Sequence, residues 1–179
     1  MDQKDWQHRT WHLAANEVES RLTEFEYAML RFREAFEHWV LQAMRTTSDI
    51  EMTFAELVIL HTLRMQGRPT SGSSIARMLN RTDLPNIQYS LRKLSSMGLI
   101  DSSKEKTGKT LNYSVTPDGV KLTDQYAELK RATLLDAYQD LPNIDAKLDG
   151  YTRALSVLTG LYEESARAAA TYSSCHPDD

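Results

Sequence analysis

The stretch Thr70–Ile100, TSGSSIARMLNRTDLPNIQYSLRKLSSMGLI, predicts two short helices joined by a sharp turn. Ile75, Ala76 and Leu79 give the first helix an apolar face at helical spacing. The turn that follows ends at Asp83, which is placed to accept hydrogen bonds from the free N–H groups that open the next helix. This arrangement is typical of a helix-turn-helix.

The second of these helices separates an apolar face, Ile87, Leu91, Leu94 and Met97, from a polar one. Asn and Gln can read adenine edges, Arg and Lys can reach guanine or phosphate, and Tyr offers a hydroxyl and a ring. The candidates for base contacts are Pro85, Asn86, Gln88, Tyr89 and Arg92. The candidates for phosphate contacts on this pair of helices are Ser71, Ser73, Ser74, Arg77, Arg81 and Lys93.

A basic hairpin is predicted directly after these helices. Leu111, Tyr113 and Val115 alternate with polar residues, which is the pattern of a half-buried strand, and a second strand-like run begins at Leu99. The segment between the two strands is basic, and its lysines are further candidates for phosphate contacts: Lys104, Lys106 and Lys109. Its position after a helix-turn-helix favours a wing over a solvated turn that is basic by chance.

Charge is distributed unevenly along the 179 residues, whose net charge is −4. Between Arg64 and Lys109 nine basic residues face three acidic ones, a local balance of +6, so the rest of the chain carries −10. Positive charge is therefore concentrated on the segment that resembles a DNA reader.

Both ends of the chain carry apolar residues at alternating spacings of three and four, between Trp11 and Ala43 and again from Leu148 to Tyr162. The first stripe is one long helix or two helices with a break near residues 21–23, where Thr23 and Glu26 have capping-box spacing. The fold class expected is mostly α (α+β), a winged helix-turn-helix with N- and C-terminal helices forming a dimerisation region. The expected organisation is an N-terminal extension and dimerisation helix at 1–47, a winged helix-turn-helix domain at 48–118, C-terminal dimerisation helices at 119–172 and a disordered tail at 173–179.

Catalysis finds no support, because the chain has no phosphate-binding glycine loop, metal triad or nucleophile elbow. We therefore expect no enzyme activity, catalytic residue, metal or cofactor. The single cysteine, Cys175, excludes an intrachain disulfide and suits a reducing compartment. With no signal peptide or membrane-spanning run, a cytoplasmic protein without a membrane partner is expected.

The chain resembles the MarR family of bacterial transcription regulators over roughly Glu24 to Leu122. The resemblance rests on Ile75-Ala-Arg-Met-Leu79, on Leu91-Arg-Lys-Leu-Ser-Ser-Met-Gly-Leu-Ile100, and on Leu111-Asn-Tyr-Ser-Val-Thr-Pro-Asp-Gly119. The resemblance implies a dimeric winged-helix protein that binds double-stranded DNA, a repressor whose DNA affinity falls when a small aromatic ligand binds. The family's Asp-Arg pair near the wing tip is absent here, so base reading depends more heavily on the recognition helix.

Two further hypotheses stay open. A pocket for an aromatic effector between the dimer helices and the winged domain could be lined by Phe32, Phe36, Trp39, His61 and Tyr113, although aromatics at helical spacing are more often core. The alternative function is a winged-helix protein–protein interaction module without sequence-specific DNA reading. The local charge of +6 favours the DNA-binding regulator.

Overall fold

The computed structural model describes residues 12–104 and 110–172. The predictions made for Lys106, Lys109, Cys175 and the tail at 173–179 lie outside these residues. The chain divides into two compact units, Met1–Lys130 and Arg131–Asp179. The first unit carries the helix-turn-helix and the sheet.

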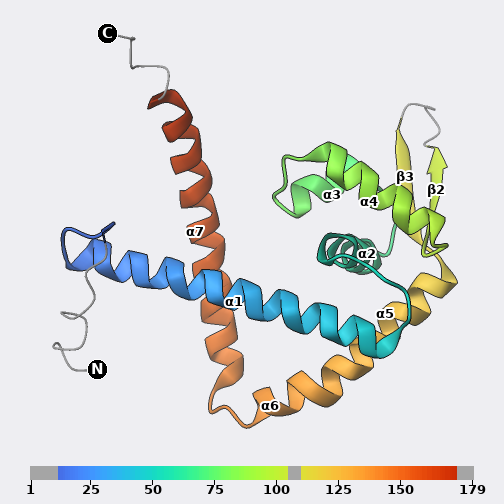
Figure 1. Ribbon diagram of the computed structural model, residues 1–179, viewed down its shortest axis with the longest axis horizontal. Coiled ribbons are helices and arrows are strands. Elements are labelled where there is room, and N and C mark those ends of the chain that lie inside the picture. The colour runs from blue at the N-terminus through green and yellow to red at the C-terminus, as the bar shows by residue number, and fades with distance from the viewer. Residues whose placement is uncertain (1–11, 105–109, 173–179) are drawn as a thin grey trace. The chain divides into compact units, whose positions relative to one another are not determined.

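The first helix, α1, runs unbroken over Glu17–Thr47 (Figure 1). It begins at Asn16, whose side-chain oxygen accepts a hydrogen bond from the Glu19 backbone N–H at 3.0 Å. The alternative of a break near residues 21–23 is wrong: the Thr23 hydroxyl donates to the Glu19 carbonyl at 2.9 Å, a bond that a helix accommodates without ending.

The second helix, α2, spans Phe54–Gln66 and begins with a complete capping box. The Glu56 backbone N–H donates to the Thr53 hydroxyl at 3.3 Å, and the Thr53 backbone N–H donates to the Glu56 carboxylate at 2.9 Å. The helix ends at Gly67, whose φ of 61° is a conformation that glycine adopts without strain. The capping-box spacing thus marked the start of this helix.

The helix-turn-helix consists of α3, Gly72–Met78, and α4, Leu84–Ser96. The hairpin that follows is β2, Ile100–Lys104, and β3, Leu111–Val115, paired antiparallel from Ile100↔Val115 to Lys104↔Leu111. A further strand, β1, covers only Thr70–Ser71 and pairs with the other edge of β3, which gives the strand order β1-β3-β2. Two residues are too few for a period-2 pattern, so β1 could not be predicted from alternation.

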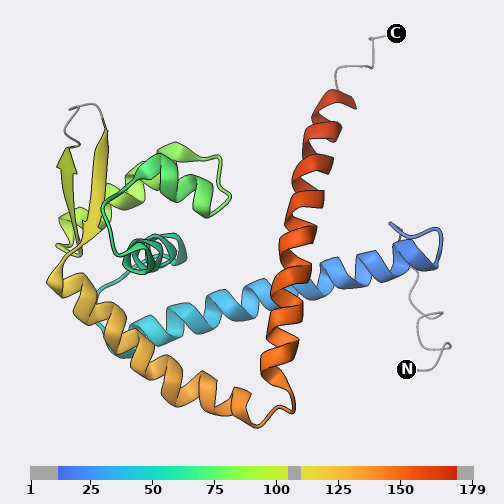
Figure 2. The same cartoon turned by 180° about the vertical axis from the view of Figure 1, so that it is seen from behind.

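The core of the first unit gathers under the helix-turn-helix. Ile75 of α3, Leu57 of α2, and Ile87, Leu91 and Leu94 of α4 have no exposed surface. In Figures 1 and 2, α2 is seen end-on between α1 and the α3–α4 pair. These features confirm the expected fold class, a mostly helical winged helix-turn-helix.

After the sheet the chain is helical again, with α5 over Pro117–Lys130, a π-helical segment over Arg131–Leu135, α6 over Asp136–Gln139 and α7 over Ile144–Tyr172. The predicted domain boundary at 118–119 falls inside α5. α7 begins at Ile144, and Asp145 lies in its first turn, where a carboxylate suits the helix dipole. No residue of α7 is buried.

Candidate DNA-binding surface

The recognition helix α4 presents a polar outer face because its opposite face is fully used in packing. Ile87, Leu91 and Leu94 are buried completely, which fixes the rotation of the helix about its axis. That rotation leaves Tyr89, 61% exposed, and Arg92 on the solvent side. Pro85 and Asn86 are exposed at the start of the same helix.

Gln88 differs from the other predicted base-contacting residues, because its side chain is held against the domain. Its amide oxygen accepts a hydrogen bond from the Tyr113 hydroxyl of β3 at 3.4 Å. Its amide nitrogen lies so close to Gly72 that a Cβ there would come within 2.5 Å. Gln88 therefore joins α4 to β3 and to the start of α3, and in this conformation it does not face outward.

The turn between α3 and α4 is closed by an ion pair. Asn80 adopts a positive φ of 52°, which Asn tolerates better than most residues. Arg81 then donates to Asp83 from Nε to Oδ1 at 2.8 Å and from Nη2 to Oδ2 at 2.5 Å. Asn86 Nδ2 donates to the same Oδ2 at 3.1 Å.

The side chain of Asp83 therefore does not act as predicted. Asp83 occupies the N-cap position of α4, but its carboxylate makes no capping hydrogen bond and binds Arg81 and Asn86 instead. The hydrogen bonds from Arg81 and Asn86 hold the pKa of this carboxyl well below its usual range, and the bond that Arg81 donates to Asp83 raises the pKa of Arg81. Two predicted DNA-contacting residues thus share one carboxylate.

Lys93 was predicted to contact phosphate, but in the structure it forms an ion pair with Glu56. Its Nζ lies 3.0 Å from the carboxylate oxygens of Glu56, whose side chain is only 2% exposed. Because Glu56 also closes the capping box of α2, the pair ties the recognition helix to the start of that helix. The ammonium group of Lys93 is therefore paired with a buried carboxylate of its own domain.

The remaining phosphate candidates that the structure describes differ in exposure: Ser71 and Ser74 are half-buried, and the others are exposed. Ser71 is the N-cap of α3, and its hydroxyl accepts from the Ser74 backbone N–H at 3.2 Å and lies 3.1 Å from the Ser73 hydroxyl. Ser73 and Arg77 are exposed on α3, and Lys104 is exposed at the end of β2. These three exposed residues, with Tyr89 and Arg92, form the outward polar surface around the helix-turn-helix.

The five aromatic candidates for an effector pocket take part in three different sets of contacts. His61 of α2 and Trp39 of α1 both contact the Tyr126 ring, with ring centroids 4.5 Å and 5.6 Å apart. Phe32 stacks on Phe36, which meets Phe54 edge-on at 5.9 Å. Tyr113, in the sheet, binds Gln88 instead.

Burial also shifts the pKa values of His61 and Tyr126, whose rings are in contact. It raises the pKa of Tyr126 to about 12. Burial, and secondarily the charge of Lys130, lowers the pKa of His61 below 6.5. Both rings therefore stay neutral more readily in the folded chain than in water.

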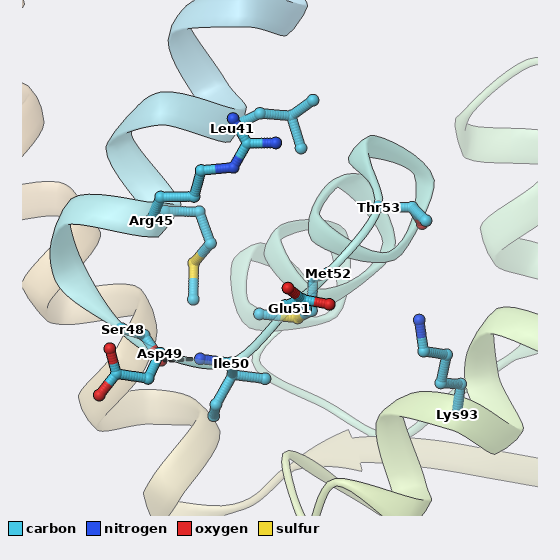
Figure 3. Close-up of a pocket in the computed structure, with 10 residues that line it drawn as sticks. Leu41, Arg45, Ser48, Asp49, Ile50, Glu51, Met52, Thr53 and Lys93 are labelled. Atoms are coloured by element: carbon cyan, nitrogen blue, oxygen red, sulfur yellow. Dashed lines mark hydrogen bonds between the residues drawn. The ribbon is translucent and has the colours of Figure 1, made fainter.

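A pocket of about 480 Å³ lies elsewhere, at the junction of α1, the loop before α2 and the recognition helix (Figure 3). Figure 3 shows Arg45 and Lys93 on different sides of this space. None of the five aromatic candidates lines it; its walls are Leu41, Met44, Arg45, Ser48, Asp49, Ile50, Glu51, Met52, Thr53 and Lys93.

Over residues 12–104 and 110–172, the His, Cys, Asp and Glu side chains form no group of three or more that could hold a metal ion. Across the same part of the chain, no helix combines the length and the apolar character that crossing a membrane requires.

Residues 52–119 match a family model described as a winged helix DNA-binding domain. The matched residues run from just before α2 to the start of α5. Over these residues the chain is similar to that family of DNA-binding domains. No curated protein sequence matches the chain.

Among solved structures, the chain is similar to AbfR of Staphylococcus epidermidis, with a TM-score of 0.67 and 16% identity over 84% of this chain and 99% of that one. It is similar to a MarR family transcriptional regulator from Rhodococcus sp. RHA1, with a TM-score of 0.62 and 14% identity over 76% of this chain and 92% of the other. It is also similar to a point mutant of S. aureus MepR bound to oligodeoxyribonucleotide, with a TM-score of 0.51 and 19% identity over 75% and 97% of the two chains. The fold that the resemblance to the MarR family implied is confirmed.

Proposed function

We propose that this protein is a homodimeric transcription regulator of the MarR type that reads double-stranded DNA with α4 and acts as a repressor. The observation that carries the proposal is the orientation of α4. Ile87, Leu91 and Leu94 of this helix are fully buried, and Tyr89 and Arg92 are exposed to solvent from a domain similar to a DNA-binding class. A helix so placed can enter the major groove, where Arg recognises guanine by two hydrogen bonds.

The apolar surface of both units supports a dimer. On α1, Val18, Leu30 and Phe32 are 76%, 60% and 57% exposed, and on α7 Tyr151 and Leu161 are 59% and 58% exposed. Soluble monomers rarely expose apolar stripes of this length, and a second copy of the chain supplies a matching stripe. A dimer would present two recognition helices to half-sites about one DNA turn, roughly 34 Å, apart.

Repression, its relief by a small aromatic effector and a cytoplasmic location complete the proposal. A dimer on an operator would block transcription by occupying the site, and a DNA partner agrees with the cytoplasmic location that we propose. The aromatic contacts of Trp39 and His61 with Tyr126 support an effector site at the α1–α2–α5 junction if the ring cluster opens. An effector there would meet α1, which carries one of the dimer stripes, and α2, which supports α4.

Selection from a pool of random duplexes is the direct test. The proposal predicts enrichment of a palindromic site whose half-sites are about 10 base pairs apart. Affinity for that site should fall with salt with a log–log slope of about −0.9 per phosphate contacted. Absence of enrichment together with flat salt dependence would favour the interaction-module alternative.

Base reading can be separated from phosphate contact by two exposed arginines. Arg92→Ala is expected to cost about 1–3 kcal/mol on the selected site and much less on random duplex, because the contact depends on base identity. Arg77→Ala on α3 is the matched control, and it should weaken both duplexes alike. Equal losses on both duplexes for Arg92→Ala would remove base reading from this position.

A further inference from the structure

The loop between α3 and α4 contains a carboxylate where a DNA-binding surface would be expected to avoid negative charge. Asp83 is 40% exposed in its side chain and stands one residue before the recognition helix. The N-terminal residues of such a helix approach base edges, and phosphates lie close on either side. A bare carboxylate at this position would repel DNA.

Two side chains that could contact DNA are instead bound to this carboxylate. Arg81 makes two hydrogen bonds to it, at 2.8 and 2.5 Å, and Asn86 makes a third at 3.1 Å. An exposed ion pair with one contact contributes little, but a bidentate guanidinium–carboxylate pair has a defined geometry. Asp83 gives up the usual capping bonds of an N-cap aspartate to make these contacts.

We propose that Asp83 is a specificity-determining residue, whose carboxylate keeps Arg81 from binding phosphates indiscriminately and orients Asn86 at the start of the recognition helix. This inference rests on the proposed DNA-binding function. Arg81 uses two of its five N–H donors on Asp83, and any phosphate that the other donors reach lies beside the Asp83 carboxylate, whose charge repels it at a cost in binding free energy. Random DNA offers no base contacts to offset that cost, whereas the correct site does.

Asp83→Asn tests the proposal, because it removes the charge and keeps the shape of the side chain. The variant should bind random duplex more tightly, with a log–log salt slope steeper by about 0.9, the value for one added phosphate contact. Its gain over the wild type should therefore shrink roughly 3.5-fold between 50 and 200 mM salt. The ratio of affinities for the selected site and random duplex should fall.

Arg81→Gln and the double variant identify the side chain responsible. In the wild-type background Arg81→Gln should weaken binding to random duplex, because it leaves the Asp83 carboxylate without its ion-pair partner and a bare carboxylate repels DNA. In the double variant with Asp83→Asn the gain should disappear. Asp83→Ser, which supplies a good N-cap residue, should reproduce the gain of Asp83→Asn, and thermal melting of each variant checks the fold.

The outcomes separate this inference from the function on which it rests. If the wild type binds a selected site but Asp83→Asn leaves the salt slope unchanged, the role of Asp83 is overturned and the proposed function stands. A gain that persists in the double variant overturns it equally, because Arg81 is then not the side chain released. If the wild type binds no duplex at any salt concentration, the proposed function fails and takes this inference with it.

Discussion

The half-buried His61 shows how the core acts on a single residue. Its ring lies against Tyr126, and Lys130 adds a positive charge nearby, so the pKa of His61 is lowered from 6.5. The folded chain therefore binds this proton less readily than the unfolded chain does. By linkage, the stability that His61 contributes is complete above pH 6.5 and is lost as the pH falls toward its lowered pKa.

His61→Gln is therefore expected to make the protein less sensitive to acid. Between about pH 7.5 and pH 5.5 the melting temperature of the wild type should fall further than that of the variant, because glutamine takes up no proton. Thermal unfolding monitored by circular dichroism at both pH values measures the difference. The control is His38→Gln on the exposed surface of α1, which should retain the wild-type difference; an identical fall for His61→Gln would contradict the prediction.

Other single-residue roles show what the sequence could and could not predict. The outward position of Tyr89 and Arg92 followed from the helical spacing of Ile87, Leu91 and Leu94, because burying one face exposes the other. The inward positions of Gln88 and Lys93 did not follow, since their partners, Tyr113 and Glu56, come from distant parts of the chain. Periodicity assigns a residue to a face of its helix but not to a particular partner.

At the scale of elements, the joint between α4, β2 and α5 fixes the recognition helix at its end. Gly98, with a φ of 72°, follows the helix, and its carbonyl accepts a hydrogen bond from the Thr116 hydroxyl at 2.7 Å. The same hydroxyl accepts from the Gly119 backbone N–H at 3.1 Å at the start of α5. A Cβ at Gly119 would lie only 2.2 Å from the Leu99 carbonyl oxygen, so the two segments are in direct backbone contact.

Gly119→Ala should therefore destabilise the first unit by about 2 kcal/mol or more, because a backbone carbonyl cannot move aside as a flexible side chain would. The matched control is Gly160→Ala in α7, where nothing lies within 4 Å of the added Cβ. That variant should stabilise its helix by about 0.5–1 kcal/mol, because alanine has the higher helix propensity. Urea unfolding of both variants gives the two free energies, and a neutral Gly119→Ala would show that the joint opens readily.

The elements themselves were largely predictable where local chemistry defines their ends. Thr53 and Glu56 marked the start of α2, and the alternation around Tyr113 marked β3. The π-helical segment Arg131–Leu135 and the short β1 carry no local signal of that kind. The α1 stripe predicted a helix but not its unbroken length, because Thr23 suits both a cap and a helix interior.

At the scale of the whole molecule, each unit leaves a stripe of apolar side chains exposed on a long helix. In the second unit, Leu148, Tyr151, Leu155 and Tyr162 recur at helical spacing along α7, and all are at least 37% exposed. In the first unit, Leu22, Phe25 and Phe36 do the same along α1, at 36% or more. These stripes were predicted from the sequence as dimerisation helices, and the pairing between copies remains a prediction.

Leu155→Arg is expected to convert the dimer to a monomer, because a guanidinium in the stripe cannot be desolvated against a second apolar stripe. Sedimentation equilibrium measures the change, and affinity for a palindromic site should fall with it. The control is Ser156→Arg, which adds the same charge to an exposed position off the stripe and should leave the dimer intact. A dimeric Leu155→Arg protein would place the interface elsewhere.

The pairing of β3 on both edges has a consequence for how this protein can change over evolutionary time. β2 holds one edge through five residue pairs, and β1, immediately before α3, holds the other at Thr70↔Tyr113 and Ser71↔Asn112. Insertions or deletions between Lys104 and Leu111 therefore leave the register of β3 anchored by β1, and with it the Tyr113–Gln88 contact to the recognition helix. Lineages can vary the length and charge of the segment between β2 and β3 while α4 keeps its place.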